Sequence, residues 1–290
     1  MKDKFYLMAA VAAAIEAGGA ILEVYRSSDF KIEEKADKSP LTLADRRSHE
    51  KIVQRLGDSG IPILSEEGKD IPYTERKRWE TYWLIDPLDG TKEFIKKNGE
   101  FTVNLALIRN RKPAGEVIYV PDKDILYFAL KDQGSYKIDS WNIIKSLEAD
   151  LDEPLKSQTA GSDTKNIAEA FDSLIARSIK LPVTGMATRP FTIIGSRSHG
   201  SPELETFVEE KRQEHGEVEF ISAGSSLKLC LVAEGKADIY PRTGPTMEWD
   251  TAAGQAIAEN AGCKVLQYDT DEPLMYNKEN LLNPWFVVKR

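Results

Sequence analysis

Apolar and polar positions recur along this chain with two periods, and each period predicts a different kind of element. A stripe at helical spacing near the N-terminus is formed by Phe5, Met8, Ala12, Ile15, Gly19 and Leu22. It predicts an amphipathic helix that runs to about Tyr25, and a second helix is predicted from Asp45 to Leu56. Short apolar runs separated by turn residues predict strands at 61–65, 82–86, 101–108, 115–119 and 125–130. Such closely spaced strands favour an antiparallel sheet.

In the second half of the chain, strand patterns alternate with helix patterns. Strands are predicted at 191–195, 218–221, 237–240, 265–266 and 286–288. Helices are predicted at 202–211, 226–233 and 249–260. This alternation is typical of an α/β layer, and the pattern is weakest from 139 to 189, with one helix near 167–179. We therefore predict an α/β protein of two lobes: an α+β lobe over 1–140, a variable connection over 141–189 and an α/β lobe over 190–290.

Composition narrows the classes of function. The 290 residues are 41% hydrophobic, enough for a substantial core, and 39 basic against 47 acidic residues give a net charge of −8. That balance argues against binding a nucleic-acid polymer, but a small anionic substrate remains compatible because local cations decide its binding. Two cysteines in core-like patterns, Cys230 and Cys263, favour a reduced, cytoplasmic protein. We expect no integral membrane segment and leave peripheral association with a membrane open.

Candidate chemistry is concentrated in the segment WLIDPLDGTKEFI, which spans 83–95. Its apolar start predicts a buried strand, and Pro87 removes a backbone donor, so we expect the strand ladder to stop there. Gly90 can adopt backbone conformations closed to most other residues, and Thr91 can begin the next helix. The segment therefore predicts a tight bend at the carboxyl end of a strand.

This bend brings together Asp86, Asp89 and the Leu88 carbonyl, and such oxygen atoms suit hard cations such as Mg²⁺. The same residue types also make ordinary surface turns. Further carboxylates stand at the ends of predicted elements: Asp45, Glu66 with Glu67, and Asp250. Each has a structural alternative: Asp45 as a helix cap, Glu66 and Glu67 as part of a solvated loop, and Asp250 as a residue that complements a helix dipole. It is their combination that favours a metal site.

The motifs occur in an order that is found in a known family. They are SPLTLAD (39–45), ILSEE (63–67), YWLIDPLDGTKEFIKKNGEFTVNLALI (82–108), GSRSH (195–199), GSSLKLCLVAEGKADIYPR (224–242) and EWDTAAG (248–254). With them the chain resembles the lithium-sensitive, Mg²⁺-dependent phosphomonoesterase superfamily that includes inositol monophosphatases and fructose bisphosphatases. Within it, the chain is most similar to bacterial 3′(2′),5′-bisphosphate nucleotidases of the CysQ type. The resemblance implies a layered αβαβα fold of the sugar-phosphatase kind and is weak over 139–190.

The resemblance also implies how Mg²⁺ is held, in two or three positions. Glu66, Asp86 and the Leu88 carbonyl would hold one ion. Asp86, Asp89 and Asp250 would hold a second, with Asp86 bridging the two. A weaker third ion would lie near Glu66.

Catalytic roles come from the same resemblance. The Thr91 hydroxyl would lie against the attacking water, and Asp45 would accept a hydrogen bond from Thr91. The pair would orient or deprotonate the nucleophile. The backbone N–H groups of Gly90 and Thr91 would hold the phosphate that is cleaved.

For the rest of the substrate, the resemblance implies that Ser225, Lys228 and Arg242 bind a second phosphate that is not cleaved, and that His199 lies near an adenine. Each has a plainer alternative: a helix cap for Ser225, a solvated side chain for Lys228 and a turn residue for His199. The full set of substrate-binding residues that follows is Glu66, Leu88, Asp89, Gly90, Thr91, Ser196, His199, Ser225, Lys228, Arg242 and Asp250.

The implied activity is hydrolysis of the 3′-phosphate of adenosine 3′,5′-bisphosphate to AMP and phosphate, which clears a by-product of sulfate activation. The partner is then a small nucleotide bisphosphate. Activity on inositol monophosphate or fructose bisphosphate is one alternative. A sensor that binds nucleotide and metal without turnover is another. Whether the protein is a monomer or a homodimer stays open.

Overall fold

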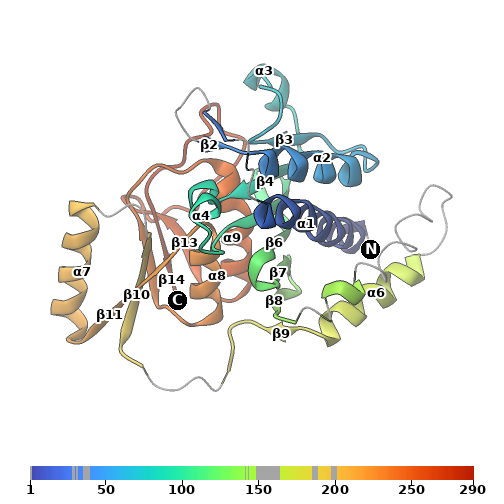
Figure 1. The fold of residues 1–290 in the computed structure, drawn as a ribbon. Coiled ribbons are helices and arrows are strands. Elements are labelled where there is room, and N and C mark those ends of the chain that lie inside the picture. Colours follow the sequence, from blue (N-terminus) through green and yellow to red (C-terminus); the bar gives the residue numbers. More distant parts are fainter. Residues whose placement is uncertain are drawn as a thin grey trace.

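Two sheets form the frame of the protein (Figure 1). The computed structural model describes residues 2–27, 30, 32–34, 40–140, 142, 144–147, 164–184, 189–196 and 201–290. The seven-stranded sheet has the order β3-β4-β5-β6-β7-β8-β9, and the five-stranded sheet has the order β11-β10-β12-β14-β13.

The strands of the seven-stranded sheet are Ile63–Ser65 (β3), Thr81–Asp89 (β4), Thr102–Arg109 (β5), Lys112–Val120 (β6), Ile125–Leu130 (β7), Gly134–Ile138 (β8) and Ile179–Lys180 (β9). Those of the five-stranded sheet are Phe191–Ser196 (β10), Val218–Ala223 (β11), Ile239–Arg242 (β12), Lys264–Gln267 (β13) and Phe286–Lys289 (β14). A separate short ladder pairs Glu33–Glu34 (β1) with Pro40–Leu41 (β2).

Helices complete a succession of helix, sheet, helix, sheet and helix (Figure 1). They are Lys2–Arg26 (α1), Leu43–Gly57 (α2), Tyr73–Arg76 (α3), Thr91–Ile95 (α4), Thr164–Ala176 (α6), Pro202–His215 (α7), Leu227–Glu234 (α8) and Glu248–Asn260 (α9), with a 3₁₀ turn at Pro121–Lys123 (η1). Helices α1 and α2 cover one face of the seven-stranded sheet, α8 and α9 lie between the sheets, and α7 covers the outer face of the second sheet. This is the predicted layered α/β fold.

The seven-stranded sheet is buried on both faces. In β5, Leu105 and Leu107 belong to the apolar cluster of α1 and α2, whereas Ala106 and Ile108 belong to the cluster of α8 and α9. A large apolar side chain contributes about 1.5–3 kcal/mol when it is fully buried. The unbroken apolar run in β5 therefore reflects packing on two sides. The second cluster continues into the other sheet through residues such as Phe286, so both sheets share one apolar layer.

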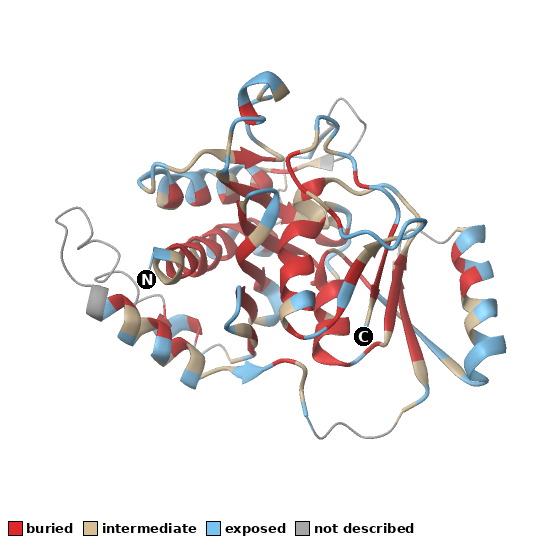
Figure 2. Ribbon diagram, turned by 180° about the vertical axis from the view of Figure 1, so that it is seen from behind, coloured by how far each residue is buried: buried red, intermediate tan, exposed pale blue. Residues whose placement is uncertain are grey.

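Helix α1 is buried far beyond the predicted single stripe, as its red colour in Figure 2 shows. The additional buried positions are mostly alanines: Ala9, Ala10, Ala13, Ala14 and Ala17. They are covered because α1 contacts α2, α6 and the sheet. We expected no segment long and apolar enough to span a membrane, but by length and composition α1 could do so. In its apolar 18-residue stretch, however, 78% is buried inside the protein. That burial is typical of the core helix of a globular domain.

Strand β4 differs from the prediction at its end. The ladder does not stop at Pro87, because Asp86 pairs with Asn104 and Asp89 pairs with Thr102. The register shifts between these two pairs, which leaves one extra residue on β4. This β-bulge holds the predicted bend inside a continuing strand.

Candidate active site

A cleft of about 270 Å³ lies where residues of both halves of the chain meet. The predicted site residues that line it are Glu66, Asp89, Gly90, Thr91, Ser196, Ser225, Lys228, Arg242 and Asp250. Asp45, Asp86 and Leu88 are buried beneath this lining. His199 lies outside the described residues. Segments remote in sequence therefore meet at this cleft.

The bulge in β4 shapes the floor of the cleft. The Leu88 N–H donates to Asp86 Oδ1 at 3.0 Å, which fixes the carboxylate against its own turn. Gly90 follows with φ of 92°, a left-handed conformation that disfavours other residues. A Cβ at Gly90 would also lie 3.1 Å from the Glu100 carbonyl oxygen. The turn therefore requires glycine for two independent reasons.

Asp45 is both a helix-capping residue and a partner of Thr91. Its Oδ2 accepts from the Thr42 N–H at 2.7 Å and from the Thr42 hydroxyl at 2.5 Å, which closes the capping box of α2. Its Oδ1 accepts from the Thr91 hydroxyl at 3.2 Å. The Thr91 hydroxyl also lies 3.4 Å from the Leu88 carbonyl oxygen. Asp45 therefore caps α2 through Oδ2 and contacts Thr91 through Oδ1, so one role does not exclude the other.

Two neighbours of Asp45 on α2 were missed in the sequence. The Ser48 hydroxyl donates to the Pro87 carbonyl at 2.6 Å, and His49 Nδ1 lies 2.9 Å from Ser65 Oγ. Burial lowers the pKa of His49 below its ordinary value. Positions 45, 48 and 49 share one face of a helix, and that spacing was the available signal. Through this face α2 contacts two segments of the site, 83–95 and the end of β3.

Asp89 is held from the other half of the chain. The Ser226 N–H donates to Asp89 Oδ2 at 2.6 Å, and Asn104 Nδ2 lies 3.4 Å from the same oxygen. The Ser226 hydroxyl in turn donates to Asn104 Oδ1 at 2.7 Å. Neither Ser226 nor Asn104 was predicted. The contact of Asn104 with Asp89 follows from the pairing of β5 with β4, whereas the contact of Ser226 depends on the packing of the two halves of the chain.

The carboxylates repel one another. Burial raises the pKa of Asp86 well above its ordinary value, and the charges of Glu66, Asp89 and Asp250 raise it further. Burial likewise raises the pKa of Asp250 well above its ordinary value, again with contributions from Asp89 and Glu66. The pKa of Asp89 is raised to about 6, mainly by burial, although Lys228 and the Ser226 N–H oppose the shift. The raised pKa values show that the protein's own cations, Lys228 near Asp89 and Arg242 near Asp250, offset only part of the repulsion within the cluster.

Such a cluster fits a hard divalent cation. All of its donors are carboxylate or carbonyl oxygens, the ligands that Mg²⁺ prefers. Within the described residues, however, no three Asp, Glu, His or Cys side chains converge as closely as the ligands of one ion do. The carboxylates approach closely enough to shift each other's pKa values but are not drawn into a ligating arrangement.

Without divalent ions, the folded protein is expected to lose stability as the pH rises from about 4 to above 6. A carboxyl group whose pKa is raised by folding stabilises the folded protein at low pH. This contribution is complete below the pKa of the group in the unfolded chain, near 3.8. It is lost as the pH rises past the pKa in the folded protein, about 6 for Asp89. Melting temperatures measured in chelator across this range test the trend. Added Mg²⁺ should flatten it, and a melting temperature in chelator that rises with pH would contradict the argument.

The cleft also contains a buried cation. Lys228 is only 5% exposed, so the solvated alternative for this side chain is wrong. Its ammonium donates to the Ser225 carbonyl at 2.5 Å, and burial lowers its pKa to about 8 although Asp89 opposes the shift. The Ser225 hydroxyl donates to the Glu100 carbonyl at 3.1 Å, so it does not cap α8. The other basic residues of the lining are Arg242, which is half-buried, and Lys92, which is exposed.

Comparison with known proteins gives one consistent result. A model of the inositol monophosphatase family matches residues 3–285. The 3′(2′),5′-bisphosphate nucleotidase CysQ of Escherichia coli (strain K12) is 40% identical over 280 residues, which cover 95% of this chain and 96% of that protein. The protein of the same name from Haemophilus influenzae is 31% identical over 276 residues, covering 93% of this chain and 87% of its own.

Solved structures agree. A crystal structure of CysQ from Bacteroides thetaiotaomicron, described as a bacterial member of the inositol monophosphatase family, has a TM-score of 0.83 at 49% identity. The match covers 98% of this chain and 96% of that one. The suppressor protein suhB of Bartonella henselae has a TM-score of 0.68 at 21% identity, covers 97% and 92%, and supports the fold alone. These likenesses confirm the layered fold.

Proposed function

This chain belongs to the inositol monophosphatase family, and we propose that it removes the 3′-phosphate of adenosine 3′,5′-bisphosphate, yielding AMP and inorganic phosphate. The observation that carries the proposal is that one cleft joins a carboxylate cluster to basic residues, among them the buried Lys228 and the half-buried Arg242. A substrate with two phosphates can place one at the carboxylate cluster, where divalent ions would bind it, and the other at the basic residues. The nucleotidases to which the chain is 31–40% identical carry the same activity in their names.

Glu66, Asp86, Asp89, Asp250 and the Leu88 carbonyl would hold the divalent ion, for which Mg²⁺ is the best candidate. When bound, the ion would neutralise phosphate charge and stabilise the leaving oxygen. Li⁺ and Ca²⁺ are expected to inhibit by occupying these oxygen positions with unsuitable geometry. Two to three ions, a cytoplasmic location and a role in sulfur metabolism are further parts of the proposal.

Thr91 and Asp45 would activate the attacking water. Because the Thr91 hydroxyl donates to Asp45, its lone pairs are turned away from that bond and can accept a hydrogen bond from water. As the water attacks, its proton would pass to Thr91 while the Thr91 proton passes to the Asp45 carboxylate. Asp45 is buried and fixed by Thr42, which keeps the acceptor in place. No side chain needs to form a covalent phosphoenzyme.

A panel of phosphate-release assays with Mg²⁺ tests the function directly. Adenosine 3′,5′-bisphosphate is expected to react much faster than inositol 1-phosphate or fructose 1,6-bisphosphate. Faster release from inositol 1-phosphate would instead support the monophosphatase alternative. Binding of the nucleotide without release of phosphate would support the sensor alternative.

Substitution of Lys228 by Met is expected to raise the KM for adenosine 3′,5′-bisphosphate by roughly 10- to 100-fold, because a charge-assisted contact of about 1.5–3 kcal/mol is lost. The KM for 3′-AMP, which has no second phosphate, should change little. Steady-state kinetics on both nucleotides provide the measurement. Lys92→Met, which removes an exposed lysine from the same lining, is the matched control and should affect both substrates weakly. Equal effects of Lys228→Met on both nucleotides would contradict the assignment.

A further inference from the structure

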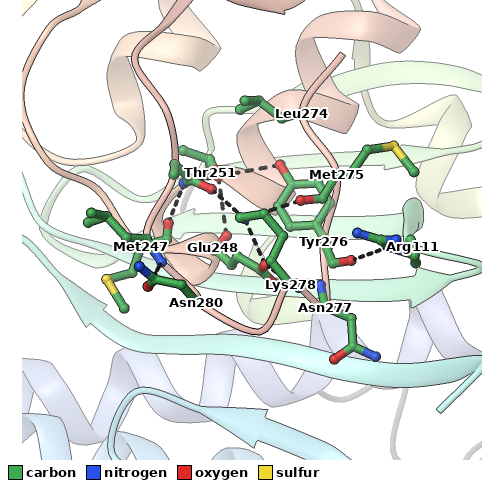
Figure 3. A network of polar contacts seen from close by, with 12 residues as sticks. Arg111, Met247, Glu248, Thr251, Leu274, Met275, Tyr276, Asn277, Lys278 and Asn280 are labelled. Carbon is green, nitrogen blue, oxygen red and sulfur yellow. Dashed lines mark hydrogen bonds and ion pairs between the residues drawn. The ribbon is translucent and has the colours of Figure 1, made fainter. Parts of the chain in front are cut away.

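A segment near the end of the chain lies against the start of α9, and we call this segment, 274–283, the C-terminal loop (Figure 3). The Glu248 side chain, which is 0% exposed, is its main attachment. Glu248 Oε2 accepts from the Asn277 N–H at 2.7 Å. Glu248 Oε1 accepts from the Lys278 N–H at 2.9 Å and from the Lys278 ammonium at 2.7 Å. Three donors from two successive residues thus converge on one buried carboxylate.

The same loop holds the residues around Asp250. Asn283 Nδ2 donates to the Met247 carbonyl at 2.7 Å and lies 2.9 Å from Thr251 Oγ1. The Glu248 N–H donates to the Leu281 carbonyl at 3.0 Å. Asp250 Oδ2 accepts from the Met247 N–H at 2.8 Å. The position of the Asp250 carboxylate is therefore set by a backbone that the C-terminal loop fixes.

On its other side, the loop receives a residue from the first half of the chain. Arg76, in the connection from β3 to β4 that begins with Glu66, is 3% exposed. Its guanidinium donates to Asn277 Oδ1 at 3.0 Å, to the Lys278 carbonyl at 2.5 Å and to the Glu279 carbonyl at 2.8 Å. Residues 277–279 thus link the segment that carries Glu66 to the helix that carries Asp250.

We propose that Glu248 is a positioning residue that holds the Asp250 carboxylate in place relative to Glu66 through the C-terminal loop. This inference rests on the proposed function, in which both carboxylates hold the divalent ion. The Lys278 ammonium also donates to the Met275 carbonyl and to Asn283 Oδ1, both at 3.2 Å, so it keeps acceptors without Glu248. The backbone N–H groups of Asn277 and Lys278, by contrast, depend on the two carboxylate oxygens, and a Gln offers only one acceptor oxygen for both. The loop and the start of α9 would therefore shift. Glu248 itself does not line the cleft.

The test compares Glu248→Gln and Lys278→Met with the wild-type protein. The Mg²⁺ concentration for half-maximal phosphate release is expected to rise roughly 10- to 100-fold, as is usual for partners that orient metal ligands. The rise in melting temperature that Mg²⁺ causes at fixed concentration should shrink in parallel, which is independent of activity. Lys278→Arg, which keeps the ion pair, should restore both quantities.

Glu234→Gln is the matched control. Glu234 is 1% exposed and is paired with Lys236 at 2.9 Å and Lys137 at 3.4 Å, but it lies outside the cleft lining. Its substitution should lower the melting temperature without changing the Mg²⁺ midpoint.

Unchanged Mg²⁺ midpoints in Glu248→Gln and Lys278→Met would overturn the inference, as would an equal shift in Glu234→Gln. Should Glu248→Gln fail to fold, Lys278→Met decides alone, since the Lys278 side chain is 25% exposed and easier to replace. Asp250→Asn tests the proposed set of metal ligands separately from the role of Glu248. If that variant keeps a normal Mg²⁺ response, the proposed ligand set is wrong, whatever Glu248 does.

Discussion

Asp86→Asn is expected to abolish phosphate release while leaving a folded protein that is more stable than the wild type in the absence of Mg²⁺. Asp86 is buried in the carboxylate cluster, and its pKa is raised by burial and by the charges of Glu66, Asp89 and Asp250. A neutral amide removes one of these repelling charges. It also removes an oxygen ligand, and loss of several kcal/mol of transition-state stabilisation corresponds to a rate that falls roughly 10³-fold or more.

The measurements are phosphate release and melting temperature with and without Mg²⁺. Glu116→Gln is a suitable control, because Glu116 is a fully buried carboxyl of the same sheet whose pKa burial also raises. It lies outside the cleft lining, so its stability change should be the same with and without Mg²⁺. Activity of Asp86→Asn within tenfold of the wild type would refute its role as a ligand.

Asp45→Asn is expected to lower kcat by roughly 10²- to 10⁴-fold, the usual contribution of a positioned general base, with little change in KM. The reason is that Asp45 Oδ1 accepts from the Thr91 hydroxyl at 3.2 Å, and an amide in that place no longer draws a proton through Thr91. Steady-state kinetics on the nucleotide provide the measurement. A fall in kcat of less than tenfold would contradict the assignment.

The control for Asp45 separates catalysis from helix capping. Thr42→Ala removes the hydroxyl contacts to Asp45 and to the Ala44 N–H but leaves Thr91 in place. It should lower the free energy of unfolding by about 1 kcal/mol, as the loss of a helix cap does, and should keep most of the activity. Thr91→Val, by contrast, should resemble Asp45→Asn in its kinetics.

The sequence predicted five of the seven strands of the first sheet, β3 to β7, because their apolar runs are bounded by turn residues. It missed Gly134–Ile138 (β8) and Ile179–Lys180 (β9), and the expected antiparallel pairing is wrong for β3, which pairs with β4 in parallel. It predicted the extent of burial of α1 poorly, because alanine is compatible with both buried and exposed helix faces. The continuation of β4 beyond Pro87 was missed, since a bulge lets a strand resume after an unpaired residue. Local pattern therefore identified most of the elements, but not how many faces of each are buried.

For the site, motif order placed Asp45, Thr91, Asp89 and Asp250 near one another, and the structure brings them together. The contact from the Ser226 N–H to Asp89 could not be predicted, because it joins residues 137 positions apart whose meeting depends on the packing of two sheets. The burial of Lys228 has the same origin. The roles of the individual site residues and the boundaries of the two lobes stay predictions.

The apolar layer that both sheets share has a consequence for dissecting the protein. Neither half expressed alone could cover that layer. Each fragment would expose a broad apolar surface to water and would tend to aggregate. Fragments produced together, however, could recombine across it without a covalent link. Because Asp89 and Asp250 come from different fragments, regained enzymatic turnover would report their reassembly.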